Sequence, residues 1–146
     1  MNYQNIDEEV LTSVYKNAHI ALQSISNVIG ETDDQKMKEE LNDEYDGYEK
    51  FIGKLSSHMK EVGCEPKDIG VLQKAFMFTS IKMNTLTDDS TSHIAELMIK
   101  GTVMGITELT EIVNKHEKDL KQTTLDLTKE LLSLEESYEQ RLKKLL

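Results

Sequence analysis

The sequence predicts an all-α protein, a four-helix bundle of two antiparallel hairpins with a short crossover helix between them. Three observations support this fold class. The 146 residues include one proline and seven glycines, too few breakers for many short elements. Apolar residues recur at spacings of three and four over long stretches, and short polar breaks separate those stretches. The length suits a single domain, 1–146, with one substantial core.

The first hairpin is predicted on either side of Gly30. Residues 6–29 carry an apolar stripe at helical spacing, and the glycine that follows favours a helix end. Thr32-Asp33-Asp34 supplies capping side chains for a second helix, which is expected to end at Gly63. Because only a few residues connect the two helices, we expect them to pack antiparallel.

The crossover contains the only proline, Pro66, in the segment Cys64-Glu65-Pro66-Lys67-Asp68. The residue before a proline avoids helical dihedrals, so this segment is the strongest predicted break. Residues 69–85 are then expected to form a short helix that is apolar on nearly every side. Such a helix needs burial on several sides, either under the rest of the fold or in an oligomer interface.

The most apolar continuous run extends from Ser92 to Val113, after a polar cluster of capping residues at 87–92. It contains Gly101 and Gly105, each of which costs a helix roughly 1 kcal/mol relative to alanine. We therefore expect a central helix with a close neighbour at both glycines, and Gly101→Leu to be severely destabilising. The helix is expected to stop near residues 114–116.

A leucine stripe from about Glu117 predicts the last helix. One continuous helix from Ser92 onward would reach about fifty residues, so a tight turn near Lys115 is favoured.

Two hairpins joined by a long crossover give the connectivity of ferritin-like bundles. Within this frame, the segment 83–105 contains Met83-Asn84-Thr85, Asp88, Ser90, His93-Ile94-Ala95-Glu96 and Gly101-Thr102-x-Met104-Gly105. In these residues the chain resembles uncharacterised ferritin-like helical bundle proteins of clostridia and related bacteria. The resemblance implies a fold and no function.

A di-iron site in this fold needs inward glutamates and Glu-x-x-His pairs, whose members share a helix face. Glu44 falls inside an apolar stripe but is followed three residues later by Gly47, and Glu108 is followed by the more outward Glu111. The last helix is expected to have no carboxylate at the centre of its stripe. A complete di-metal centre is therefore not expected.

The remaining metal candidates are Glu44, Glu108, His93 and Glu96. His93 and Glu96 have a chelating spacing, although capping and the helix dipole explain both residues equally well. The alternative for Glu44 is a buried acid that is hydrogen-bonded to Tyr48 or Asn17.

Composition limits the partners and the compartment. The net charge of −10 argues against nucleic-acid binding, and the single cysteine, Cys64, excludes an internal disulfide and suits the cytoplasm. Neither a signal peptide nor a membrane-spanning segment is indicated.

No catalytic motif is found, so the first functional hypothesis is a non-catalytic bundle that acts through its surface, as a homo-oligomer (a dimer is favoured) or with a protein partner. The alternative is a ferritin-like metalloprotein with an atypical site, for which iron is the expected cofactor and iron storage or peroxide handling the expected role. A third hypothesis is a ligand cavity between the hairpins, lined by Met37, Met59, Met98 and Met104.

Overall fold

The computed structural model describes the backbone of residues 3–65 and 90–146 and the side chains of residues 6–65 and 90–146. Over these ranges the chain is all-helical, as predicted. Its elements are α1 (Tyr3–Val28), the short 3-10 turn η1 (Ile29–Glu31), α2 (Gln35–Glu61), α4 (Thr91–His116) and α5 (Gln122–Lys143). The predicted crossover helix at 69–85 lies outside the described residues.

The helix ends follow from local side-chain chemistry. The Asp34 carboxylate accepts a hydrogen bond from the Met37 amide (2.8 Å) at the start of α2, and the Ser90 hydroxyl accepts one from the His93 amide (3.3 Å) at the start of α4. After α2, Gly63 has a positive φ of 69°, a conformation that favours glycine. These predicted helix ends are confirmed, and α4 ends at His116, close to the predicted turn.

The start of α5 has a cap that comes from another helix. Lys121 precedes α5 and makes no side-chain capping bond of its own. Its backbone amide donates to the carboxylate of Asp7 in α1 (3.1 Å), and Asp7 is buried. The α1 helix therefore helps to fix where α5 begins.

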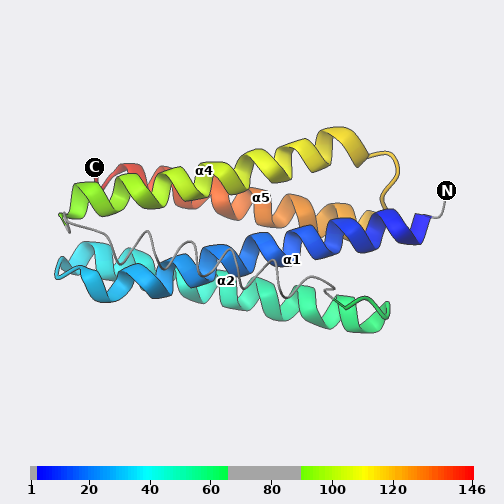
Figure 1. Cartoon of the computed structure of the whole chain (residues 1–146), viewed down its shortest axis with the longest axis horizontal. Coiled ribbons are helices and arrows are strands. Elements are labelled where there is room, and N and C mark those ends of the chain that lie inside the picture. The colour runs from blue at the N-terminus through cyan, green and yellow to red at the C-terminus, as the bar shows by residue number, and fades with distance from the viewer. Residues whose placement is uncertain (1–2, 66–89) are drawn as a thin grey trace.

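The four long helices of the described ranges lie lengthwise beside one another, with α1 next to α2 and α4 next to α5 (Figure 1). At one end of α1, the thiol of Cys64, just after α2, approaches the Glu8 carbonyl at 4.0 Å. Near the other end of α2, Arg141 of α5 bonds Glu40 (3.0 Å) and Asp43 (2.7 Å). Cys64 is buried.

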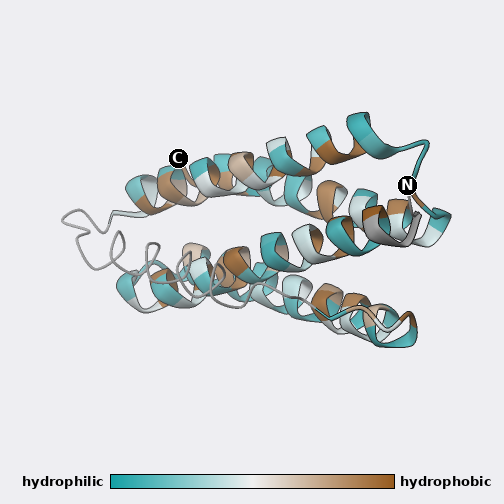
Figure 2. Cartoon of the chain, turned by 45° about the vertical axis from the view of Figure 1, so that its right-hand side comes forward, coloured by the Kyte–Doolittle hydropathy of each residue, from teal (hydrophilic) through white to brown (hydrophobic). Residues whose placement is uncertain are grey.

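One apolar core runs along the bundle axis. Figure 2 shows apolar residues gathering on the faces that the helices turn toward one another. Its fully buried large apolar side chains come from all four long helices of the described ranges: Leu11, Ile25, Met37, Leu41, Tyr48, Leu55, Ile94, Leu109, Leu131 and Leu142. Burial of this apolar surface is the main force that holds the helices together.

The prediction of a central helix at 92–113 is wrong at Gly101 and right at Gly105. Gly101 is exposed, and a Cβ there would meet nothing within 4 Å, so Gly101→Leu is not expected to clash. Its neighbours Val103 and Met104 are exposed by 38% and 75%. At Gly105, by contrast, a Cβ would lie 2.5 Å from a carboxylate oxygen of Glu135. Therefore α4 is one wall of the bundle rather than its centre.

Candidate functional site

Polar side chains from three helices meet in the otherwise apolar middle of the bundle. They are Asn17 of α1, Glu44 and Tyr48 of α2, and Glu135 and Tyr138 of α5, all of which are buried. Each shares a helix face with core residues because helical spacing of three or four residues separates them, as Leu41 precedes Glu44 and Leu131 precedes Glu135. The core therefore contains a polar layer.

Two glycines make room for this layer. Near Gly105, Asn17 donates a hydrogen bond from its amide to the Gly105 carbonyl (3.2 Å), and the Glu135 carboxyl occupies the adjacent space. Near Gly47, the Tyr138 hydroxyl occupies the position that a Cβ would need. The Tyr138 ring meets Tyr48 edge-on, with centroids 5.3 Å apart.

Glu44 is an uncharged carboxylic acid at neutral pH. Burial raises its pKa to about 10, helped by a hydrogen bond with the Glu40 carboxyl and by the Glu40 charge, while the Arg141 charge acts in the opposite direction. Its Oε2 atom is buried without a hydrogen-bond partner. The predicted partners Tyr48 and Asn17 are wrong for Glu44, because Glu40 is the side chain to which it is bonded.

Glu135 is a second uncharged acid. Its pKa is raised to about 9, mainly by burial and also by the Glu108 charge, while a hydrogen bond from the Tyr48 hydroxyl acts in the opposite direction. Its Oε1 atom has no hydrogen-bond partner, although only 1% of the residue is exposed. Burial and the nearby Glu135 and Glu44 also raise the pKa of Tyr48.

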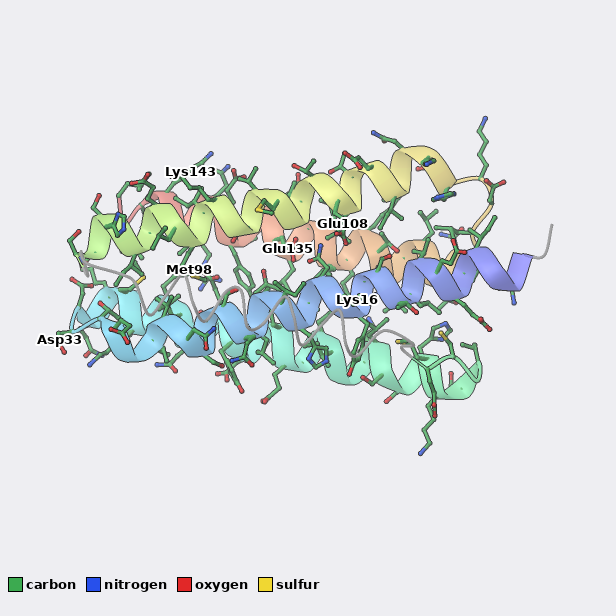
Figure 3. The ribbon with its side chains drawn as sticks, viewed as in Figure 1. Lys16, Asp33, Met98, Glu108, Glu135 and Lys143 are labelled. Carbon is green, nitrogen blue, oxygen red and sulfur yellow. The ribbon has the colours of Figure 1, made fainter. Side chains whose placement is uncertain are left out.

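Glu108 lies at the edge of the same site. Figure 3 shows Glu108 and Glu135 on α4 and α5 near the middle of the bundle, with Lys16 of α1 across from them. Partial burial raises the pKa of Glu108, while a hydrogen bond with Asn17 and the Lys16 charge lower it. Because it is exposed on one side, Glu108 connects the polar layer with solvent.

A cavity of about 420 Å³ opens beside the polar layer, between α1, α2, α4 and α5. This volume is in the usual range for sites that bind small organic molecules, roughly 300–1,000 Å³. Its polar lining includes Asn17, Glu44, Tyr48, Glu108 and Glu135. Apolar side chains form most of the remaining wall: Ile20, Ala21, Ile25, Leu97, Met98 and Met104.

The prediction that four methionines line a cavity is correct for two of them. Met98 and Met104 line this cavity, whereas Met37 and Met59 are buried in the apolar core and are not part of the described lining.

The structure does not bring the four predicted metal candidates together. Glu44 and Glu108 both line the cavity. Glu96 precedes Glu108 by twelve residues on α4, a rise of about 18 Å along the axis, and it forms an ion pair with Lys100 (2.9 Å). His93 is bonded through its backbone amide to Ser90, in the first turn of α4.

Sequence reasoning missed Glu135, and the expectation that the last helix has no central carboxylate is wrong. Its position was visible in the spacing, since Glu135 lies four residues after Leu131 and three before Tyr138. Leu134, which belongs to the leucine stripe that predicts this helix, is only half-buried.

The residues of the polar layer fit a di-metal centre poorly. A di-metal centre would need a histidine three residues after Glu44. Gly47 stands at this position, and the Tyr138 hydroxyl fills the space that a side chain of residue 47 would need. On α5, Tyr138 stands three residues after Glu135, where a second histidine would be needed. Within residues 6–65 and 90–146, His, Cys, Asp and Glu side chains form no group of three that could hold a metal ion.

Comparison with known protein families, with curated proteins and with solved structures found no match for this chain. In the part of the chain that the structure describes, no helix has the length and apolar character needed to cross a membrane.

Proposed function

We propose that this protein is a ferritin-like helical bundle that binds a small molecule in its central cavity and is not a catalyst. The observation that carries the proposal is the cavity of about 420 Å³, whose apolar wall carries a few convergent polar groups. Ligand sites in helical bundles have this composition. The acids that face the cavity have unpartnered oxygens, Oε2 of Glu44 and Oε1 of Glu135, to which a ligand could bond.

The ferritin-like part of the proposal concerns connectivity. Two antiparallel hairpins are supported by the short η1 turn between α1 and α2, by the approach of Cys64 to Glu8, and by the pairing of Arg141 with Glu40. The resemblance to clostridial-type proteins, the cytoplasmic location and the single-domain organisation stay predictions from the sequence.

Blocking the cavity tests the proposal. In the variant Gly101→Phe, the new side chain enters open space at the cavity wall, so the bundle should fold while the cavity is obstructed. Gly53→Phe is the matched control, because Gly53 is an exposed helical glycine with open space around it and is not part of the described lining. A small-molecule library screened by ligand-observed NMR should give binders shared by the wild type and Gly53→Phe and lost in Gly101→Phe. Binders retained by all three proteins would contradict the proposal.

A second candidate is a metalloprotein with an atypical centre, with iron as the cofactor. It is favoured by one observation, that Glu44, Glu108 and Glu135 approach one cavity from three different helices. Elemental analysis of the protein purified from iron-fed cells tests it. Stoichiometric iron that is lost in Glu135→Gln would support this candidate, and iron far below one atom per chain would contradict it.

Action through a surface, as a homodimer or with a protein partner, stays a prediction. The exposed Val103 and Met104 of α4 support it, because adjacent apolar side chains on a surface helix suit a helix contact. The mass in solution should be that of a dimer, and Met104→Lys should shift it toward a monomer. A wild-type monomer that recovers no partner from cell extract would contradict the prediction.

A further inference from the structure

We infer that the central cavity takes an organic cation with an apolar body, which is held by the carboxyl groups of Glu135 and Glu44. This inference rests on the proposed function and names the chemical class of its ligand. It concerns a molecule of the size of a substituted ammonium ion rather than a bare metal ion.

The first argument is that acidic residues outnumber basic residues in the lining of the cavity. Three acids line it, Glu44, Glu108 and Glu135, while Lys100 is the only basic residue among its described lining residues. Lys100 forms an ion pair with Glu96 at 2.9 Å, and its side chain is 69% exposed. A cation in the cavity would therefore stabilise the carboxylate forms of Glu44 and Glu135, whose carboxyl groups are protonated at pH 7 in the free protein.

The second argument comes from the unpartnered oxygens. Glu44 and Glu135 are each only 1% exposed, and each has one carboxyl oxygen without a hydrogen-bond partner. A buried oxygen of this kind destabilises the protein unless a ligand or water bonds to it. Because the two residues belong to different helices, α2 and α5, a bound cation would contact both sides of the bundle.

The third argument concerns the body of the ligand. Apolar side chains from α1 and α4, including Ile20, Ile25 and Met98, form the rest of the wall. An inorganic ion would leave this apolar surface facing water, whereas an alkyl or aryl group would cover it. Tyr48 also lines the cavity, and an aromatic ring attracts a substituted ammonium group.

Binding of a permanent cation should release a proton. In the free protein the Glu135 carboxyl carries a proton at pH 7, because its pKa is about 9. The facing groups are Glu108 of α4, which raises this pKa, and Tyr48 of α2, which lowers it. When the cation binds, Glu135 becomes a carboxylate and its proton passes to solvent, so affinity should rise as much as about tenfold per pH unit up to this pKa.

Glu44 has a different set of charged neighbours. These are Glu40 and Asp43 of α2, which raise its pKa, and Arg141 of α5, which lowers it. Since Arg141 already bonds Glu40 and Asp43, it is not free to enter the cavity. Because the pKa of Glu44, about 10, is higher than that of Glu135, about 9, Glu44 is harder to deprotonate. We therefore expect Glu135 to contribute more than Glu44 to the affinity for a cation below pH 9.

The experiment compares benzyltrimethylammonium with neopentylbenzene, its uncharged isostere, by NMR titration of methionine methyl groups. Signals of Met98 and Met104 should shift, and those of Met37 and Met59, which are not part of the described lining, should not. At pH 8 the cation should bind at least about ten times more tightly than the isostere, and from pH 7 to pH 8 its affinity should rise up to about tenfold.

The variant Glu135→Gln keeps a polar side chain of similar size and removes the charge. It should weaken binding of the cation by about tenfold or more and leave the isostere unaffected. Glu136→Gln, at the adjacent exposed position of α5, is the control and should change neither affinity.

Equal binding of the two probes at Met98 would overturn the inference while leaving the proposed binding cavity intact. Loss of cation binding on addition of equimolar Fe²⁺ or Zn²⁺ would show an inorganic site and would also overturn it. Absence of any shift at Met98 with the cation would overturn it as well, and the screen with Gly101→Phe would then decide on the cavity separately.

Discussion

The hydroxyl of Tyr138 in α5 lies where the side chain of residue 47 in α2 would be, and Gly47 is the residue that permits this contact. Tyr138 is only 4% exposed, and its ring is fixed by the edge-on contact with Tyr48. Tyr138 therefore packs into the space that Gly47 leaves open, and this contact joins two helices that are distant in sequence. The same contact fills the place at which a metal-binding histidine would have to stand.

Gly47→Ala should destabilise the bundle by about 1–3 kcal/mol, because the added methyl group collides with the Tyr138 hydroxyl. Urea denaturation measures this change. Tyr138→Phe removes the colliding atom, so Gly47→Ala should cost less in that background. Additive effects of the two changes would show that the residues do not touch.

Gly101→Ala and Gly105→Ala should change stability in opposite directions. Alanine at the open Gly101 should stabilise α4 by up to about 1 kcal/mol through helix propensity. At Gly105 the methyl group meets the buried Glu135 carboxyl and Asn17, so the protein should lose about 1 kcal/mol or more. Thermal unfolding of the two variants distinguishes them, and equal shifts would contradict the packing at Gly105.

Stability should fall as pH rises from about 4.5 to about 9. Glu44 and Glu135 have pKa values of about 10 and about 9 in the folded protein, against 4.5 as the ordinary value. Over this window the folded state keeps protons that the unfolded state has lost, so each group lowers the free energy of unfolding by at most about 1.4 kcal/mol per pH unit.

Substitution by glutamine measures how much Glu44 and Glu135 each contribute to the pH dependence of stability. Glu135→Gln and Glu44→Gln should each weaken the pH dependence between pH 5.5 and pH 8.5, since an amide does not titrate. Glu136→Gln, on the exposed side of α5, should leave it unchanged. A wild-type protein that becomes steadily more stable toward pH 8.5 would contradict the burial of uncharged acids.

Arg141→Ala should cost more stability than Lys54→Ala. Arg141 bonds Glu40 at 3.0 Å and Asp43 at 2.7 Å, and it also lies 5.3 Å from the Tyr138 ring, so its loss should cost about 1–2 kcal/mol. Lys54 makes one exposed ion pair with Glu130, which should contribute less than about 1 kcal/mol. Chemical denaturation of both variants at low and high salt provides the comparison.

The sequence predicted the helices well because their signals are local. Capping side chains at Asp34 and Ser90 and the glycine at Gly63 act within one turn, so they could be located without knowledge of the neighbours. The polar layer was harder to predict, since it depends on which helix faces each residue. Gly101 and Gly105 are one turn apart and look equivalent in sequence, yet only Gly105 meets another helix.

Glu135 is another residue whose burial could not be predicted from local sequence signals. A glutamate within a leucine-rich helix normally faces solvent, and the spacing alone allowed either Leu134 or Glu135 to face the core. Which of the two faces the core depends on residues far away in sequence. Tyr48 donates a hydrogen bond to the Glu135 carboxyl, and Gly105 leaves room for it, so the acid can be buried.

The most direct test of this account is a ¹³C NMR titration of the glutamate carboxyl groups. We predict that Glu44 and Glu135 still carry their protons at pH 7 and titrate with pKa values of about 10 and about 9. Carboxyl signals of both residues that titrate near 4.5, the ordinary value, would contradict the buried acid-lined cavity on which the proposed function rests.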